Sequence, residues 1–231
     1  MRISILGGTG DIGEGLALRW GRDTDHEIVI GSREADRAVT AATRYAGQLQ
    51  ARGYDPTITG DGNEAAVRGA DVVVASVPPY SVADAIEQLG ESIPEDAIIV
   101  TPAVGIKRDD DGVHYHRPSV GSVTRLAADA ASESVSVVGA FHSVPAQRLA
   151  DLDDPLDMDT IVIGDDTDAR TTILGLANEI EGLTALNGGP IANAPEVESL
   201  TALLINLGRY NESLHEAGIR VVSPDRPAYD S

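Results

Sequence analysis

The stretch that decides the fold is residues 1–13, MRISILGGTGDIG. A short run of β-branched and apolar residues leads into three glycines, Gly8, Gly10 and Gly13, which have the spacing GxGxxG. A segment with helical periodicity follows, and a second β-branched run comes after it. A strand, a glycine turn and a helix in this order are typical of the phosphate-binding turn of a Rossmann βαβ unit.

Each glycine has a distinct expected role. Gly8 makes the tight turn, Gly10 lets the backbone approach a pyrophosphate, and Gly13 lets the helix pack against the strand. Thr9, Asp11 and Ile12 complete the turn, and the helix N-terminus attracts the pyrophosphate charge. The alternative is a plain structural turn without a ligand.

The end of the second predicted strand indicates which dinucleotide binds. Sites that prefer NAD usually present a carboxylate there to hold the ribose hydroxyls. This chain has Ser32 and Arg33 instead, with Arg37 one helical turn later. A guanidinium pairs with a 2′-phosphate, so we expect NADP. The alternative is an arginine that is simply solvated on a loop.

Working outward, β-branched runs alternate with helical segments, which predicts an α/β fold: a Rossmann-type, doubly wound parallel sheet. We expect an NADP-binding domain over residues 1–150, a small α/β C-terminal domain over 151–219 and a disordered tail over 220–231. Residues 107–118 show no periodicity and predict a surface loop. The expected strands of the first domain are Arg2–Leu6, Glu27–Ile30, Asp71–Val77, Ala97–Thr101 and Val135–Ala140.

In the second domain, short strands are expected at Thr160–Gly164 and Thr184–Asn187. A long final helix should have Pro195 in its first turn and Gly218 just beyond its end. Leucines recur along it at three- and four-residue spacing, which is typical of a core or dimer-interface face. We therefore expect a homodimer.

Composition excludes several classes of protein. The 231 residues include 37 acidic and 17 basic side chains, no cysteine, and a net charge of −20. Such a surface disfavours nucleic acid as a partner. The carboxylates are spread along the chain, so a uniformly solvated surface is favoured over an acidic docking face. Together with a single lysine, Lys107, this resembles the proteins of salt-loving archaea.

No signal peptide and no apolar run long enough to span a membrane are present in the sequence. We therefore expect a cytoplasmic protein without a membrane partner. The histidines outside residue 142 have no partner at metal-ligand spacing, so no metal site is expected.

The chain resembles the coenzyme F420-dependent NADP reductases of archaea and actinobacteria over about residues 1–219. The segment around His142 is the most distinctive part of this resemblance. The matching stretches are GGTG at 7–10, GLALR at 15–19, HEIV at 26–29, GSR at 31–33, GAFHSVPA at 139–146, GDD at 164–166, and ESLT at 198–201 with Asn206.

The resemblance implies hydride transfer between C4 of NADPH and C5 of coenzyme F420, an 8-hydroxy-5-deazaflavin, with both bound side by side. Transfer between two such rings needs proximity and a dry pocket rather than a protein acid, base or nucleophile. The residues that the resemblance implies for NADP are Thr9 through Ile12, Ser32, Arg33 and Arg37. Those implied to line the dinucleotide or nicotinamide are Pro79, Ala83, Val104 and Ala146.

His142 follows a predicted buried strand, at the carboxyl edge of the sheet. It could hydrogen-bond the deazaflavin or balance its charge, which makes it the candidate catalytic, positioning residue. Alternatively it is a half-buried histidine that shapes the loop. The resemblance favours the first interpretation.

Two other functions compete with this one. The first is an NADP-dependent reductase of a small imine, keto acid or metal chelate, because the same fold serves many substrates. Such enzymes commonly use a lysine or an acid–base pair, and the position of Lys107 in the predicted loop argues against that. The second is a non-enzymatic NADP-sensing regulator, which would bind NADP without turnover.

Overall fold

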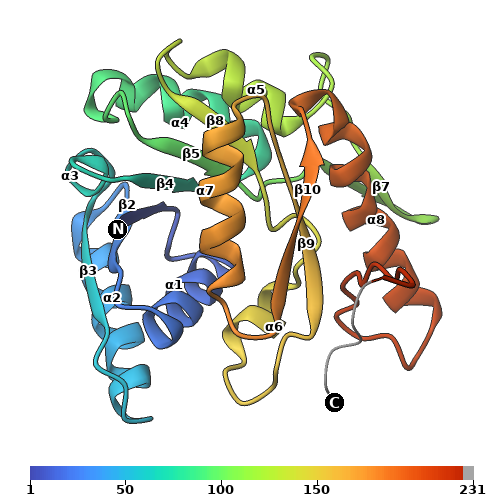
Figure 1. Ribbon diagram of the computed structural model, residues 1–231, viewed down its shortest axis with the longest axis horizontal. Helices are drawn as coiled ribbons and strands as arrows, with labels where there is room; N and C mark the ends of the chain where they lie inside the picture. The colour runs from blue at the N-terminus through green and yellow to red at the C-terminus, as the bar shows by residue number, and fades with distance from the viewer. Residues whose placement is uncertain (226–231) are drawn as a thin grey trace.

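The computed structural model describes residues 1–225, and residues 226–231 lie outside the described part. An eight-stranded sheet in the order β10-β9-β8-β5-β4-β1-β2-β3 runs through the molecule (Figure 1). Adjacent strands are parallel except β8 and β9. The strands are β1 Arg2–Leu6, β2 Glu27–Ser32, β3 Thr57–Gly62, β4 Val72–Ala75, β5 Ile98–Thr101, β8 Ser136–Gly139, β9 Met158–Gly164 and β10 Leu183–Gly189.

Helices cover both faces of this sheet, which confirms the doubly wound α/β fold. Apolar side chains of α1, α2, α6 and α7 pack on one face, and those of α3, α4, α5 and α8 pack on the other. The strands expected after residue 150, β9 and β10, extend the same sheet. The helices are α1 Asp11–Asp23, α2 Ala35–Gln50, α3 Asn63–Val67, α4 Val82–Leu89, α5 Val123–Ala130, α6 Ala146–Ala150, α7 Thr167–Asn178 and α8 Ala194–Tyr210.

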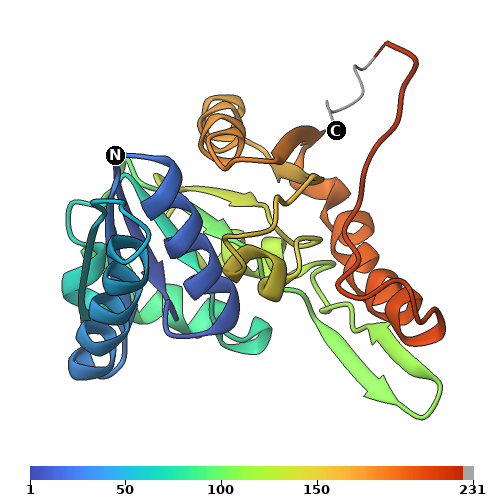
Figure 2. The same cartoon turned by 90° about the horizontal axis from the view of Figure 1, so that it is seen from below.

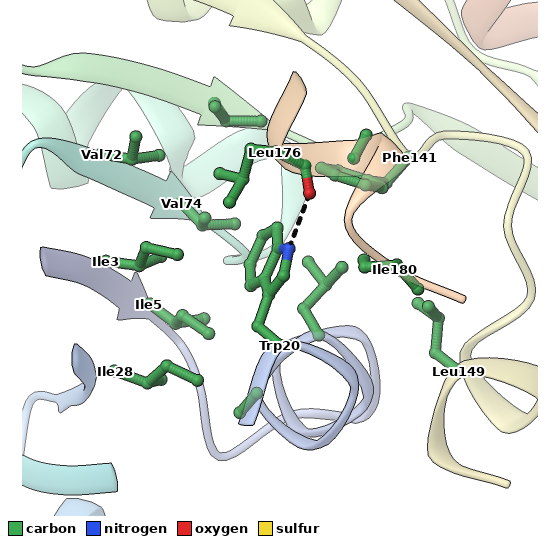
Figure 3. Packing of buried hydrophobic residues seen from close by; sticks show 14 of the residues in the cluster. Ile3, Ile5, Trp20, Ile28, Val72, Val74, Phe141, Leu149, Leu176 and Ile180 are labelled. Atoms are coloured by element: carbon green, nitrogen blue, oxygen red, sulfur yellow. Dashed lines mark hydrogen bonds between the residues drawn. The ribbon is translucent and has the colours of Figure 1, made fainter. Parts of the chain in front are cut away.

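Trp20 of α1 organises the larger core (Figure 3). Its indole Nε1 donates a hydrogen bond to the Leu176 carbonyl of α7 at 3.0 Å. Its ring meets Phe141, just after β8, edge to face with centroids 5.7 Å apart. Because a buried indole must find an acceptor for its N–H, this contact fixes α1 relative to α7.

Two regions differ from the sequence prediction: one strand was not predicted, and one predicted loop is a hairpin. Strand β3 lies at the edge of the sheet with alternating exposure, and its glycines and aspartate hide it from a search for apolar runs. The loop expected over residues 107–118 is wrong. Strands β6, Ile106–Asp109, and β7, Gly112–Tyr115, form an antiparallel hairpin that projects beside α8 (Figure 2).

The final helix ends earlier than expected. Pro195 lies in the first turn of α8 as predicted, but the helix stops at Tyr210 rather than near Gly218. The amide Nδ2 of Asn211 donates to the Leu207 carbonyl at 3.0 Å and so satisfies one of the last helical acceptors. Within residues 1–225, no helix has the length and apolar character needed to cross a bilayer.

The last described segment is joined to β9, the strand next to the edge strand β10. The backbone N–H of Asp159, in β9, donates to the Ile219 carbonyl at 2.8 Å. The N–H of Val221 donates to Oδ2 of the Asp159 carboxylate at 2.6 Å. Of the tail expected over residues 220–231, the part after Asp225 lies outside the described residues.

Candidate functional site

The glycine turn joins β1 to α1 at the carboxyl edge of the sheet. Gly7 has a φ of +68°, and a Cβ there would lie 2.3 Å from the Ser76 carbonyl oxygen. A Cβ on Gly13 would lie 2.6 Å from the Cα of Gly8. The positive φ therefore belongs to Gly7 rather than to Gly8, and Gly13 lets α1 lie close to the turn itself rather than to the strand named in the prediction.

The N-terminus of α1 faces this turn without a side-chain cap. Gly10 is the N-cap residue, and its own N–H donates to the Gly7 carbonyl at 2.9 Å. The hydroxyl of Tyr45, from α2, donates to the Gly8 carbonyl at 2.9 Å and holds the turn from behind. Uncapped helical N–H groups and the helix dipole favour an anion at this position. Asp11 and Ile12 lie in the first turn of α1, and their contact with NADP stays a prediction.

A cavity of about 1000 Å³ opens beside the turn. Its walls come from the turn, the ends of β2 and β3, and the loop after β4. It brings together predicted NADP residues from two separate segments, which are Thr9, Gly10, Ser32, Arg33 and Arg37. The volume suits a dinucleotide-sized ligand.

Arg33 and Arg37 carry charges that no carboxylate of the described chain neutralises. Arg44 is paired with Glu14, and Arg19 and Arg170 donate to backbone carbonyls. No ion pair within residues 1–225 includes Arg33 or Arg37. Both are exposed at the cavity. In a chain with a net charge of −20, two unpaired cations beside one cavity indicate a site for a multiply charged anion.

Ser32 completes this end of the cavity. It is buried at the end of β2, and its Oγ accepts a hydrogen bond from the Glu34 N–H at 3.3 Å. The carboxylates of Glu34, Glu64 and Asp84 also line the cavity, and Glu64 is paired with Arg68. Arg33 and Arg37 therefore keep two positive charges beside Ser32 that no ion pair within residues 1–225 neutralises.

Asn63 is a site residue that sequence reasoning missed. It begins α3, directly after β3, and lines the same cavity. Its buried Oδ1 has no hydrogen-bond partner within the described chain. An unpartnered buried acceptor beside the predicted 2′-phosphate residues fits a ligand that brings a hydroxyl or amino donor, as a nucleoside does. Because β3 was not foreseen, no sequence signal placed Asn63 here.

The four residues implied for the nicotinamide end lie at the carboxyl ends of neighbouring strands. Pro79 begins the 3₁₀ turn η1, Pro79–Ser81, after β4, and Ala83 follows in α4. Val104 follows β5, and Ala146 begins α6 after β8. The cavity reaches Pro78 and Ser81 but is not lined by any of the four, so their contact with the nicotinamide stays a prediction.

His142 is deeply buried rather than half-buried, with 5% of its surface exposed. Neither ring nitrogen has a hydrogen-bond partner within residues 1–225, while its carbonyl accepts from the Thr201 hydroxyl at 2.7 Å. Burial lowers the pKa of His142 to about 4, so the ring is neutral near pH 7. A neutral ring favours the hydrogen-bonding role over charge balance, and that role stays a prediction.

A second buried cluster connects α8 to the rest of the site. The carboxylate of Glu198 is fully buried and accepts from the N–H groups of Val123 and Thr124 and from the hydroxyls of Thr124 and Tyr115, each at 2.9 Å. Burial, together with the adjacent Glu198, raises the pKa of the Tyr115 phenol. Glu198 therefore joins α8 to the start of α5 and to the hairpin.

A doubly wound sheet with an uncapped glycine turn and unpaired arginines at the next strand end defines a dinucleotide-binding protein. The family model described as NADP oxidoreductase, coenzyme F420-dependent, matches residues 2–105. The F420-dependent NADP reductase of Methanocaldococcus jannaschii is 36% identical over 225 residues, covering 96% of this chain and 99% of that protein. The chain belongs to the family of F420-dependent NADP reductases, which confirms the resemblance seen in the sequence.

Two further comparisons agree. The F420-dependent NADP reductase of Methanothermobacter thermautotrophicus is 34% identical over 227 residues, covering 96% of this chain and 95% of that protein. A crystal structure from Arthrobacter sp. FB24, provisionally described as an F420-dependent NADP reductase, superposes with a TM-score of 0.79 at 20% identity. It covers 96% of this chain and 100% of that one, and it supports the fold.

Proposed function

We propose that this chain catalyses reversible hydride transfer between NADP(H) and coenzyme F420. The observation that carries the proposal is the pair of unpaired guanidiniums, Arg33 and Arg37, beside Ser32 and the glycine turn. These groups suit the 2′-phosphate of NADP, and full-length similarity to reductases of that name supplies the deazaflavin as acceptor.

The protein's contribution is binding and orientation. The α1 N-terminus would hold the pyrophosphate, and Ser32, Arg33 and Arg37 would hold the 2′-phosphate. The two co-substrates supply the redox chemistry. Pro79, Ala83, Val104 and Ala146 would shape the surface on which the nicotinamide meets the deazaflavin, and the neutral His142 would orient one of the rings by a hydrogen bond.

A coupled absorbance assay tests the function. NADPH and oxidised deazaflavin, mixed with the enzyme in concentrated salt, should both lose absorbance in a one-to-one ratio. Binding of NADP without turnover of any acceptor would instead support a sensor. Turnover of an imine or keto acid but not of the deazaflavin would support the other reductase class.

The variant Arg33→Ala tests the choice of dinucleotide. Loss of a charge-assisted contact should weaken NADP binding roughly 10- to 100-fold and leave NAD binding almost unchanged. Arg125→Ala, an exposed arginine on α5 paired with Asp129, is the matched control. An unchanged preference for NADP in Arg33→Ala would contradict the assignment of this site.

We also propose a homodimer that uses the outer face of α8. Leu203, Leu207 and Tyr210 are exposed there by 55%, 37% and 66%, an unusual run of large apolar side chains on a surface helix. Light scattering on the enzyme should give twice the chain mass, and Leu203→Glu should give the monomer mass. The acidic surface suits a cytoplasm rich in salt, so the dimer is best measured at high ionic strength.

A further inference from the structure

Tyr80 and His116 form a hydrogen-bonded pair between η1 and the end of the hairpin. The Tyr80 hydroxyl is bonded to the His116 Nδ1. The two rings also meet edge to face, with centroids 5.7 Å apart. Both side chains are exposed, and Tyr80 by 57%, so the pair is in contact with solvent.

The pair connects the turn after β4 to the chain that follows β7, and that chain lies against the loop that leaves β5. Tyr80 directly follows Pro79. The His116 N–H donates to the carbonyl of Gly105, the residue after Val104, at 2.8 Å. A Cβ on Gly105 would lie 2.4 Å from the His116 carbonyl oxygen, so only glycine permits this approach. The pair therefore lies next to the two loop residues proposed to contact the nicotinamide.

The reaction needs a proton as well as a hydride. Reduction of a 5-deazaflavin adds a hydride to C5 and a proton to N1, and NADPH supplies only the hydride. Oxidation of the reduced deazaflavin returns that proton. His142 is a poor carrier, because it is buried and its ring nitrogens have no partner within residues 1–225. The Tyr80 hydroxyl and the His116 ring both carry exchangeable protons, and the two groups are hydrogen-bonded to each other. Both side chains are also exposed to solvent.

We propose that Tyr80 and His116 carry the proton of the hydride transfer between solvent and the deazaflavin. This inference rests on the proposed function. During reduction of the deazaflavin, the Tyr80 hydroxyl gives its proton to N1 and takes one from Nδ1 of His116. The His116 ring takes a proton from solvent at Nε2, so that one solvent proton is consumed for each hydride transferred. The reverse sequence removes the proton when the deazaflavin is oxidised.

Two substitutions separate this role from packing. Tyr80→Phe keeps the ring against His116 but removes the hydroxyl, and His116→Gln keeps a polar side chain that cannot carry a proton. The matched control is His114→Gln, a histidine on the same hairpin that is bonded instead to Asp109 at 3.0 Å. In single-turnover reduction of the deazaflavin by NADPH, both test variants should be roughly 10- to 100-fold slower, and the control should match the wild type.

Added imidazole should restore part of the rate in His116→Gln, and it should not change the rate of Tyr80→Phe. Two readouts do not depend on turnover. The dissociation constants of NADP and of oxidised deazaflavin should change less than about threefold in both variants. In the NMR spectrum of the wild type, oxidised deazaflavin alone should shift the Cε1–H signal of His116 and leave that of His114 in place.

The relay would be overturned by full activity of Tyr80→Phe, or by a His116 Cε1–H chemical shift that does not change when deazaflavin is added. Either result would leave the proposed function intact. A wild-type enzyme that transfers no hydride to the deazaflavin would overturn the proposed function and the relay with it. Slow variants with normal binding and imidazole rescue would support both.

Discussion

At the phosphate turn the backbone itself makes the site, whereas at the opposite end of the molecule side chains of α8 hold the hairpin β6–β7 in place. The turn depends on glycines where a side chain would strike another backbone atom, such as Gly7 against Ser76. The hairpin depends on partners about a hundred residues away in the chain. Glu198 and Asn206 both bind it, and Asn206 exchanges two hydrogen bonds with the Val113 backbone.

This difference has a consequence for how each region fails. A side chain added at a glycine of the turn would collide with backbone atoms, and a change of rotamer cannot relieve that collision. A wrong residue in α8 leaves buried donors without acceptors but keeps the main chain free to adjust. Three substitutions test this contrast and a fourth tests the burial of His142, and they are taken from the largest expected effect to the smallest.

Gly7→Ala should have the largest effect. The added Cβ meets a backbone oxygen at 2.3 Å, and the φ of +68° is unfavourable for alanine. We expect a loss of roughly 3–5 kcal/mol in the free energy of unfolding and no measurable NADP binding. Urea unfolding and calorimetric titration with NADP measure the two effects.

The control for this variant is Gly47→Ala. Gly47 lies inside α2, and a Cβ there meets nothing within 4 Å. It should leave NADP binding unchanged and stabilise the protein by about 0.5–1 kcal/mol, because alanine favours a helix more than glycine does. A Gly7→Ala protein that behaves like this control would show that the turn has more freedom than its contacts imply.

Glu198→Gln should cost about 3 kcal/mol, because four donors that face a carboxylate would face one amide oxygen and one competing NH₂ group. The measurement is urea unfolding near pH 7. Glu196→Gln, exposed on the same helix, should change stability by less than about 0.5 kcal/mol. Equal stabilities of the two variants would mean that the Glu198 cluster does not hold α8 to α5.

His142 should make stability depend on pH. Its folded-state pKa of about 4 lies below the ordinary 6.5, so above pH 6.5 the ring is neutral in both states. As the pH falls from 6.5 toward 4, only the unfolded chain binds the proton, and the free energy of unfolding should drop by roughly 2–3 kcal/mol. His142→Gln should remove this part of the drop, and superimposable pH profiles would show that the ring titrates normally.

Asn206→Ala should have the smallest effect, a loss of about 1–2 kcal/mol in the free energy of unfolding. The Val113 N–H and carbonyl, which lose this amide, can form hydrogen bonds with water instead. The local readout is amide hydrogen exchange at Val113, which should become faster while exchange in β1 stays slow. Asn187→Ala, on the exposed end of β10, is the comparison variant. Unchanged protection at Val113 would show that the hairpin stands without α8.

The two regions also differ in how far the sequence predicted them. Strands β1, β2, β4, β5 and β8, which lie at the centre of the sheet, were predicted because each is a run of apolar residues followed by a turn. Thr9, Gly10, Ser32, Arg33 and Arg37 could be assigned to one site because parallel strands end at the same edge. Strand β3 was missed because it lies at the edge and is half polar, and Asn63 was missed with it.

The sequence by itself determined the central strands of the sheet, the glycine turn and the cationic strand end, because each depends on neighbours in the chain or on a constraint that only glycine satisfies. Only the tertiary structure decided that residues 106–115 form a hairpin, that α8 stops at Tyr210, that His142 is buried and neutral, and that Tyr80 meets His116. Those features depend on contacts between residues far apart in sequence, such as Asn206 with Val113. Local periodicity reflects only neighbouring residues, so it cannot predict such contacts.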